Sequence, residues 1–236
     1  MTSHAVDSKQ FNLAIETSQR QGFVSLGRVD DVLATEALKQ VRRHNAELMP
    51  TIARLCERFD ASPSDLRDVY MSIGPGSFTG LRIAVATVKM LAYSLGVRIV
   101  AVPTLDVLAA NVLHDYSHLA VCLNLKRESV YSGLYESRDE RWCALSEPVL
   151  RTIEEIDKAM PAKFVLLGDP LPEFESSDRV TRLPAELAVP RSDVVYTLGR
   201  GAAQRGAFVS AEALVPMYVR PPEAVEVWEK NQSRAR

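Results

Sequence analysis

Two short stretches of the sequence carry residue types that suit the binding of an anion. Glu16-Thr17-Ser18 combines a carboxylate with two hydroxyls, which together could hold the metal ion and phosphates of a nucleotide. The loop from Gly74 to Gly80 contains three glycines, which permit positive φ and close backbone approach. An apolar stretch of helical character follows it, and a helix N-terminus offers free N–H groups to an anion. The candidate anion or nucleotide loop is Thr17, Ser18, Gly74, Gly76, Ser77, Thr79 and Gly80.

Both stretches also have a plainer interpretation. A Walker-type phosphate loop ends in Gly-Lys-Ser/Thr, whereas Gly80 is followed by Leu81-Arg82. The glycines are therefore equally explained by a tight turn between a strand and a helix. A polar turn at the tip of a hairpin likewise explains Glu16 to Ser18. The sequence leaves both pairs of alternatives open.

Other residues capable of chemistry form no recognisable catalytic or metal-binding group. His114 and His118 have the spacing of two ligands on one helix face, but no third ligand is evident nearby, so we interpret them as surface histidines. The serines, Ser77 and Ser132 among them, lack a nucleophile elbow. Cys56, Cys122 and Cys143 are widely spaced, which indicates reduced thiols rather than disulfides or zinc. We therefore predict no catalytic residue, no metal and no cofactor.

The elements that position these residues alternate between strands and helices in the first half of the chain. Apolar runs bounded by turn residues predict strands, and apolar residues at helical spacing predict helices. Strands are expected at 11–15, 23–26, 32–37, 69–73 and 97–102, and helices at 44–59, 78–95 and 104–113. A hairpin sheet followed by strand–helix units is typical of an α/β layer.

A second, smaller lobe is expected after this layer. Its strands are predicted at 119–123, 130–135 and 164–167, its helices at 153–159 and 192–206, an irregular segment at 172–190 and an extended one at 214–219. We therefore place the first lobe at 1–112 and the second at 113–220. A loose polar tail is expected at 221–236.

The predicted helix at 78–95 has more apolar surface than one sheet can cover. Twelve of its eighteen residues are apolar, and Arg82 and Lys89 are its only charges. A helix resting on a sheet needs an apolar stripe only ~100° wide. Because soluble proteins rarely leave large apolar patches bare, we interpret this helix as a surface for a partner.

Composition places the chain among ordinary soluble globular proteins. Charged residues make up 25% of its 236 residues and hydrophobic ones 47%, and the net charge is -2. That charge gives no general attraction to nucleic acid. The N-terminus lacks a signal-peptide core, and Lys89 interrupts the longest apolar run, so we expect no membrane span and a cytoplasmic location.

The run Gly74-Pro-Gly-Ser-Phe-Thr-Gly-Leu-Arg82 closely resembles the signature of the TsaB (YeaZ) family. That family is the dimerisation subunit of the bacterial machinery that makes N6-threonylcarbamoyladenosine in tRNA. Further matches are Leu13 to Ser18, Val102 to Ala109 and Leu214 to Arg220. The resemblance spans about residues 11–222 and is strongest before 110.

The resemblance implies an actin/Hsp70/sugar-kinase-like α/β fold with a full first lobe and a reduced second lobe. It implies a scaffold that docks the catalytic TsaD subunit, is joined by the ATPase TsaE, pairs with itself through the same surface, and meets tRNA only through the complex. The surface would be the helices at 44–59 and 78–95. The expected core contacts are Leu48, Met49, Ile52, Leu55, Ala84, Val88 and Leu91, with His44 and Arg82 at the rim. The change Val88→Glu is then expected to abolish pairing.

The resemblance also implies that the chain is not an enzyme. Active members of this superfamily need acids and glycine-rich loops in both lobes, but here Asn124-Leu-Lys-Arg127 stands where an Asp is usual, and Glu16 replaces the first-lobe Asp. Thr104 to Leu108 contains no histidine where the catalytic relative has its metal pair. The alternative is an ATP-dependent kinase or ATPase that uses Thr17, Ser18 and the Gly74–Gly80 loop. A peptidase has no evident nucleophile–base pair.

Overall fold

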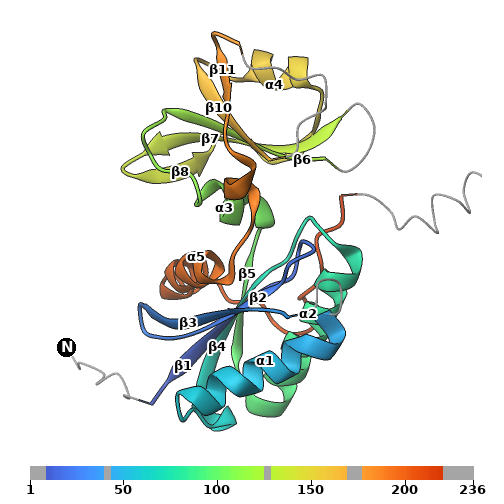
Figure 1. Ribbon diagram of the computed structural model, residues 1–236, viewed down its shortest axis with the longest axis vertical. Helices are drawn as coiled ribbons and strands as arrows, with labels where there is room; N and C mark the ends of the chain where they lie inside the picture. The colour runs from blue at the N-terminus through green and yellow to red at the C-terminus, as the bar shows by residue number, and fades with distance from the viewer. Residues whose placement is uncertain (1–8, 40–43, 125–128, 169–176, 220–236) are drawn as a thin grey trace, which may run out of the picture.

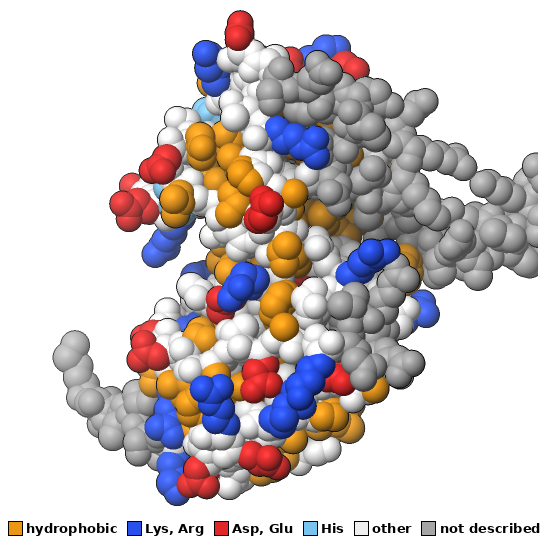
Figure 2. Space-filling view, in the orientation of Figure 1, with side chains coloured by type: hydrophobic (Ala, Val, Ile, Leu, Met, Phe, Trp, Pro, Cys, Tyr) orange, Lys and Arg blue, Asp and Glu red, His pale blue; other side chains and the backbone are white. Residues whose placement is uncertain are grey.

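The computed structural model describes residues 9–39, 44–124, 129–168 and 177–219 of the chain. Two β-sheets form two lobes, drawn one above the other in Figure 1 and visible as two masses in Figure 2. The first sheet has the strand order β3-β2-β1-β4-β5. The second has the order β11-β10-β6-β7-β8, and β9 also pairs with β7. The α/β architecture expected from the sequence is confirmed.

The first sheet is organised around β1 (Phe11–Glu16), whose six residues are all buried. β1 pairs antiparallel with β2 (Phe23–Arg28) and parallel with β4 (Leu66–Ser72), while β3 (Asp31–Ala37) extends the sheet beyond β2 and β5 (Arg98–Val102) extends it beyond β4. A strand buried on both sides needs cover on both faces of its sheet. On one face, α1 (His44–Arg58) and α2 (Phe78–Leu95) provide that cover; η1 (Pro63–Asp65) leads into β4.

The ends of α2 lie where the sequence predicts them. Ser77 Oγ accepts a hydrogen bond from the Gly80 N–H at 3.3 Å, and Gly96 ends the helix with a φ of 72°. In the described part of the chain, α2 is also long and apolar enough to cross a membrane by length and composition alone, contrary to the expectation based on Lys89. Its inward residues are buried against the sheet and α1, as in the core helix of a folded domain.

The second lobe is built on β6 (His118–Asn124), which lies between β7 (Val130–Arg138) and β10 (Phe164–Gly168). The helix α4 (Ile153–Ala159) has the predicted bounds and begins with a capping box, in which the Thr152 N–H donates to Glu155 Oε2 at 2.8 Å. Three short strands were not predicted: β8 (Arg141–Ala144), β9 (Val149–Arg151) and β11 (Val180–Arg182). β11 and η2 (Ala185–Ala188) lie within the segment expected to be irregular.

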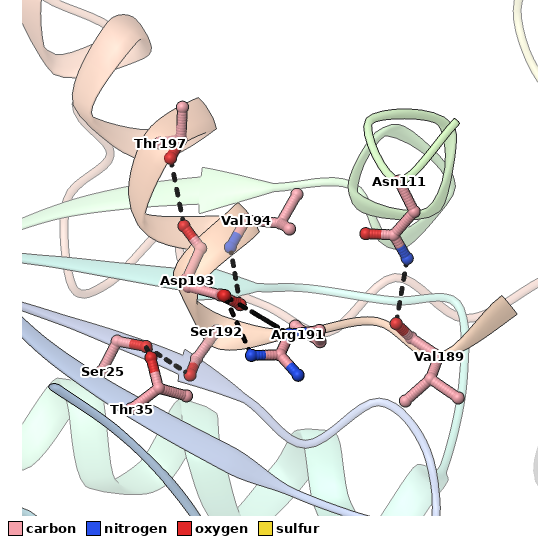
Figure 3. Close-up of polar contacts among 9 residues, drawn as sticks. All are labelled: Ser25, Thr35, Asn111, Val189, Arg191, Ser192, Asp193, Val194 and Thr197. Atoms are coloured by element: carbon pink, nitrogen blue, oxygen red, sulfur yellow. Dashed lines mark hydrogen bonds and ion pairs between the residues drawn. The ribbon is translucent and has the colours of Figure 1, made fainter. Parts of the chain in front are cut away.

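The helix α5 (Ser192–Gln204) covers the second face of the first sheet, although its position in the sequence suggested the second lobe. Tyr196 packs with Tyr70 of β4, their ring centroids 5.4 Å apart. At its start, Ser192 Oγ lies 2.7 Å from Ser25 Oγ of β2, which in turn lies 2.7 Å from Thr35 Oγ1 of β3 (Figure 3). The chain therefore returns to the first lobe near residue 190.

The two lobes meet around α3 (Thr104–Ala109), which is shorter than the helix predicted at 104–113. Asn111, just after α3, donates from Nδ2 to the carbonyl oxygens of Leu187 at 2.8 Å and Val189 at 3.0 Å, so the two crossing segments are bonded to each other. Figure 3 shows the bond to Val189. Tyr135 of β7 donates to Asp106 of α3 at 2.8 Å. α3 thus fills the space between the two sheets.

Candidate functional site

The structure brings the two polar stretches together at the end of β1. Glu16, Thr17 and Ser18 are all buried, and Thr17 Oγ1 donates to the Gly80 carbonyl at 3.0 Å. The Ser77 N–H donates to the Ser18 carbonyl at 2.6 Å. The two stretches therefore form one compact structure, although about 60 residues separate them in sequence.

The glycine loop is used for close packing inside the chain. A Cβ added to Gly76 would overlap the Ser18 carbonyl oxygen, so only glycine fits there. Gly74 has a φ of 108°, which also favours glycine. The N–H of Ser77 is bonded to Ser18 and that of Gly80 to Ser77 Oγ, so two loop donors already have partners. The geometry favours the tight turn over the anion cradle. Thr79 is the exposed member of this set.

Glu16 supplies the carboxyl of the two joined polar stretches, and its side chain is completely buried. The Ser18 N–H donates to its Oε1 at 2.5 Å, while Oε2 has no partner of good geometry among the described residues. Burial raises the pKa of the Glu16 carboxyl, and the hydrogen bond from the Ser18 N–H acts in the opposite direction. Its enclosure by the chain leaves it poorly placed to hold a metal with phosphates.

The remaining polar candidates stay apart from this loop. His114 is exposed, with its ring centroid 5.2 Å from that of Trp142, and His118 lies in β6. Within the described ranges, no three His, Cys, Asp or Glu side chains are grouped as metal ligands would be. Asn124 ends β6, and Lys126 and Arg127 lie outside the described residues.

Most of the residues expected to contact a partner lie in the protein's own core, which corrects their expected position. Six of them are at most 6% exposed: Leu48, Ile52, Leu55, Ala84, Val88 and Leu91. They pack together with β1, β4 and β5 in one cluster. The apolar arc of α2 is wide because it packs on the sheet, on α1 and on Leu214 from the end of the chain, a set of neighbours that the helix sequence alone does not reveal.

The outward side of the same two helices is a different set of residues. On α1 the exposed residues include Ala46, Met49, Pro50 and Ala53, and on α2 they include Thr79, Arg82, Ala86, Met90 and Tyr93. We call these nine residues the outer face. Of the predicted contacts, only Met49 and Arg82 belong to it; the side chain of His44 lies outside the described ones. The residues of the outer face recur every three or four positions along each helix, which is a sequence signal for an exposed stripe. The larger apolar residues on the buried side of the same helices form a stronger pattern.

The outer face is mostly small or apolar. Met49 is 38% exposed and Met90 47%, and the alanines of the outer face on the same two helices are exposed as well. Among these nine residues Arg82 is the single formal charge, and the exposed Glu57 and Arg58 lie at the end of α1. Methionine and aromatic residues are enriched in protein interfaces, and charge is depleted at their centres. The face therefore has the chemistry of a helix-docking surface.

Comparison with known proteins identifies the family to which this chain is similar. A family model described as "TsaD: tRNA N6-adenosine threonylcarbamoyltransferase" matches residues 31–170. The tRNA threonylcarbamoyladenosine biosynthesis protein TsaB of Bacillus subtilis is 31% identical over 239 aligned positions, covering 93% of this chain and 98% of that protein.

Two solved structures from Pseudomonas aeruginosa share the fold. One, described as an uncharacterised protein with similarity to peptidase YeaZ, is 24% identical with a TM-score of 0.74 and covers 89% of this chain and all of its own. The other, YeaZ, is 23% identical with a TM-score of 0.71, covering 89% of this chain and 99% of its own. The two-lobe, actin/Hsp70/sugar-kinase-like fold expected from the sequence is confirmed.

Proposed function

This chain belongs to the TsaB (YeaZ) family of tRNA threonylcarbamoyladenosine biosynthesis, and we propose that it is the non-catalytic scaffold that docks a TsaD-type transferase subunit. The observation that carries the proposal is the outer face. It exposes two methionines and three alanines on neighbouring helices, while the opposite sides of those helices already satisfy the chain's own core. A partner that covers this face would bury about 800 Å² on each side if the contact is of standard size.

The same face supports self-association. Two copies of a two-helix layer can pack as a four-helix arrangement, and small residues such as Ala46, Ala53 and Ala86 let the helices approach closely. A second copy and a TsaD-type subunit would then compete for one surface. A TsaE-type ATPase would join the assembly, tRNA would be met only through it, and the proposed location is cytoplasmic.

The enclosed Glu16 supports a non-catalytic role. An ATPase or kinase needs charged carboxylates for its metal and free backbone donors for phosphates. Here the carboxyl is buried with a raised pKa, and the Ser77 N–H is bonded within the chain.

The description of one structural neighbour mentions a peptidase, but this chain gives that function little support. Ser132 is buried, and its Oγ donates to the Val149 carbonyl at 3.4 Å. Ser137 Oγ and His114 Nδ1 lie 3.4 Å apart, but no described carboxylate is bonded to that histidine. A serine peptidase needs its base oriented by such a third group.

The docking role is tested by titrating a TsaD-type subunit with the full chain in a calorimeter. The change Met90→Glu places a charge on the outer face. This charge is exposed in the free chain and would be buried without an opposite charge in the complex. We expect it to weaken binding by about 100-fold or more. Leu113→Glu is the matched control, since Leu113 is 72% exposed and follows α3 rather than lying on α1 or α2. Unchanged affinity of the Met90→Glu variant would contradict the proposal.

The enzyme alternative is tested on the isolated chain with Mg-ATP. The proposal predicts neither tight binding nor hydrolysis above the level of a buffer control. Turnover that is lost in a Glu16→Gln variant would favour a kinase or ATPase instead.

A further inference from the structure

The end of the described chain runs alongside α2 in the opposite direction (Figure 1). We call residues 209–219 the C-terminal strap. Its Val209 N–H donates to the Ile99 carbonyl of β5 at 2.9 Å, and the Met217 N–H donates to the Ile73 carbonyl after β4 at 2.7 Å. Between them, Leu214 is 2% exposed within the first-lobe core. The strap is therefore anchored at both ends and in the middle.

The strap contacts α2 at both ends of the helix. Near its last turn, Tyr93 OH donates to Glu212 Oε1 at 3.3 Å. Near its first turn, the ring of Tyr218 stacks on Phe78, with the centroids 4.3 Å apart and the planes 9° from parallel. The strap thus follows one flank of the outer face along its length.

Tyr218 also determines where Arg82 lies. Arg82 Nε donates to Tyr218 OH at 2.9 Å, and its guanidinium carbon lies 5.7 Å from the ring centroids of both Phe78 and Tyr218. A free arginine side chain has several rotatable bonds, and ordering it on binding costs entropy. Here one hydrogen bond and two aromatic rings hold the guanidinium before any partner arrives.

Most of the hydrogen-bonding capacity of Arg82 remains unused. A guanidinium has five N–H donors, and the Nε–H is the one with a bonded partner among residues 9–39, 44–124, 129–168 and 177–219. No carboxylate in those ranges forms an ion pair with it, although Arg82 is exposed. A planar guanidinium with its terminal groups free is suited to take a carboxylate through two parallel hydrogen bonds.

We propose that Arg82 is a preformed receptor for a carboxylate side chain of the TsaD-type partner, and that Tyr218 of the C-terminal strap is its positioning residue. The inference rests on the proposed docking function and names the chemistry that the partner presents. Arg82 is the single formal charge among the nine residues of the outer face, while Glu57 and Arg58 are exposed at the end of α1, so Arg82 would help to fix the register of a mostly apolar contact. Arginine is a frequent hot-spot residue, and a partly desolvated ion pair there is stronger than one at an exposed surface.

The test is calorimetric titration of the TsaD-type subunit with the full chain and its variants at several salt concentrations. Arg82→Gln is expected to weaken binding by about tenfold or more and to flatten its salt dependence. Arg82→Lys keeps the charge but loses the planar fork and the Nε–H, and is expected to recover only part of the loss. Arg205→Gln, an exposed arginine after α5, is the control.

Tyr218→Phe retains the stacked ring but removes the acceptor for Arg82 Nε. It is expected to weaken binding by about threefold while leaving the melting temperature unchanged, and the Arg82→Gln/Tyr218→Phe double variant should bind no worse than Arg82→Gln alone. An additive loss in the double variant would show that Tyr218 contacts the partner by itself, and would overturn its positioning role.

Two outcomes separate this inference from the docking proposal. If Met90→Glu abolishes binding but Arg82→Gln does not change it, docking stands and the carboxylate receptor is wrong. If the unmodified chain does not bind at all, the docking function itself fails. Residues 220–236 contain Glu223, Glu226 and Glu229. Tighter binding by a chain ending at Val219 would indicate that these carboxylates occupy Arg82, and would also overturn the inference.

Discussion

The α1–α2 layer has an inner and an outer side, and the two differ in what covers them. The inner side carries large aliphatic residues such as Leu55 and Val88, which are buried against the first sheet. The outer side carries alanines and methionines that the chain leaves exposed. The comparison shows that the most apolar part of a helix need not be the part that meets a partner, because the largest apolar side chains pack in the protein's own core.

The sharpest way to break this comparison is to place the same charge on each side of α2. Val88→Glu puts a carboxylate at a position that is 0% exposed, where burying an unpaired charge costs about 3–5 kcal/mol. We expect this variant to lose its cooperative thermal transition or to melt far below the unmodified chain. It therefore cannot report on pairing, although the sequence predicts that this change would abolish pairing.

Met90→Glu lies two residues further on and is the counterpart. Its side chain is 47% exposed in the free chain, so its free energy of unfolding should change by only about 0.5 kcal/mol while docking is lost. Equal destabilisation by Val88→Glu and Met90→Glu in urea titrations would mean that the two sides of α2 do not differ as described.

Two glycines of α5, on the other face of the first sheet, show the same contrast between a packed and an open side of a helix. A Cβ on Gly199 would lie 2.5 Å from Cβ of Tyr70, whereas the nearest neighbour of a Cβ on Gly201 is Arg205 Nη1 at 3.5 Å. We expect Gly199→Ala to destabilise the protein by about 1–3 kcal/mol through overpacking. Gly201→Ala should be neutral or stabilising, because alanine favours helix by up to about 1 kcal/mol. Chemical denaturation of both variants measures the difference.

A smaller effect is expected at Glu16, the enclosed carboxyl of the loop. Because burial raises its folded-state pKa, its contribution to stability is fully present below the ordinary glutamate pKa of 4.5 and is lost as the pH rises through the raised value. Glu16→Gln keeps an acceptor for the Ser18 N–H and removes the charge. We expect it to exceed the unmodified chain in stability at pH 8, with the difference vanishing near pH 4. An equal difference at both pH values would contradict the raised pKa.

Local signals in the sequence predict the core elements well. The bounds of α2 follow from the Ser77 cap and Gly96, and the start of α4 follows from the capping box at Thr152. The buried strands β1, β4, β6 and β10 follow from their apolar runs. In each case the information lies within a few residues of the element.

What the sequence does not reveal depends on contacts between distant segments. β8, β9 and β11 have only three or four residues each, too few for a period-2 pattern. No local signal shows that α5 returns to the first sheet, since its apolar face would fit either lobe. The outer face stayed hidden for the same reason: the neighbours that cover the rest of α2 come from α1 and from the C-terminal strap.

The most direct test of the docking account is hydrogen–deuterium exchange of the chain alone and in complex with a TsaD-type subunit. The backbone amides of a helix are already hydrogen-bonded and exchange slowly in the free chain. The experiment therefore measures how much slower they exchange when the partner is bound. The account predicts that the added protection is confined to α1, α2 and the C-terminal strap, with β8 and β9 unchanged. Added protection on the second lobe, with none on α1 and α2, would contradict it.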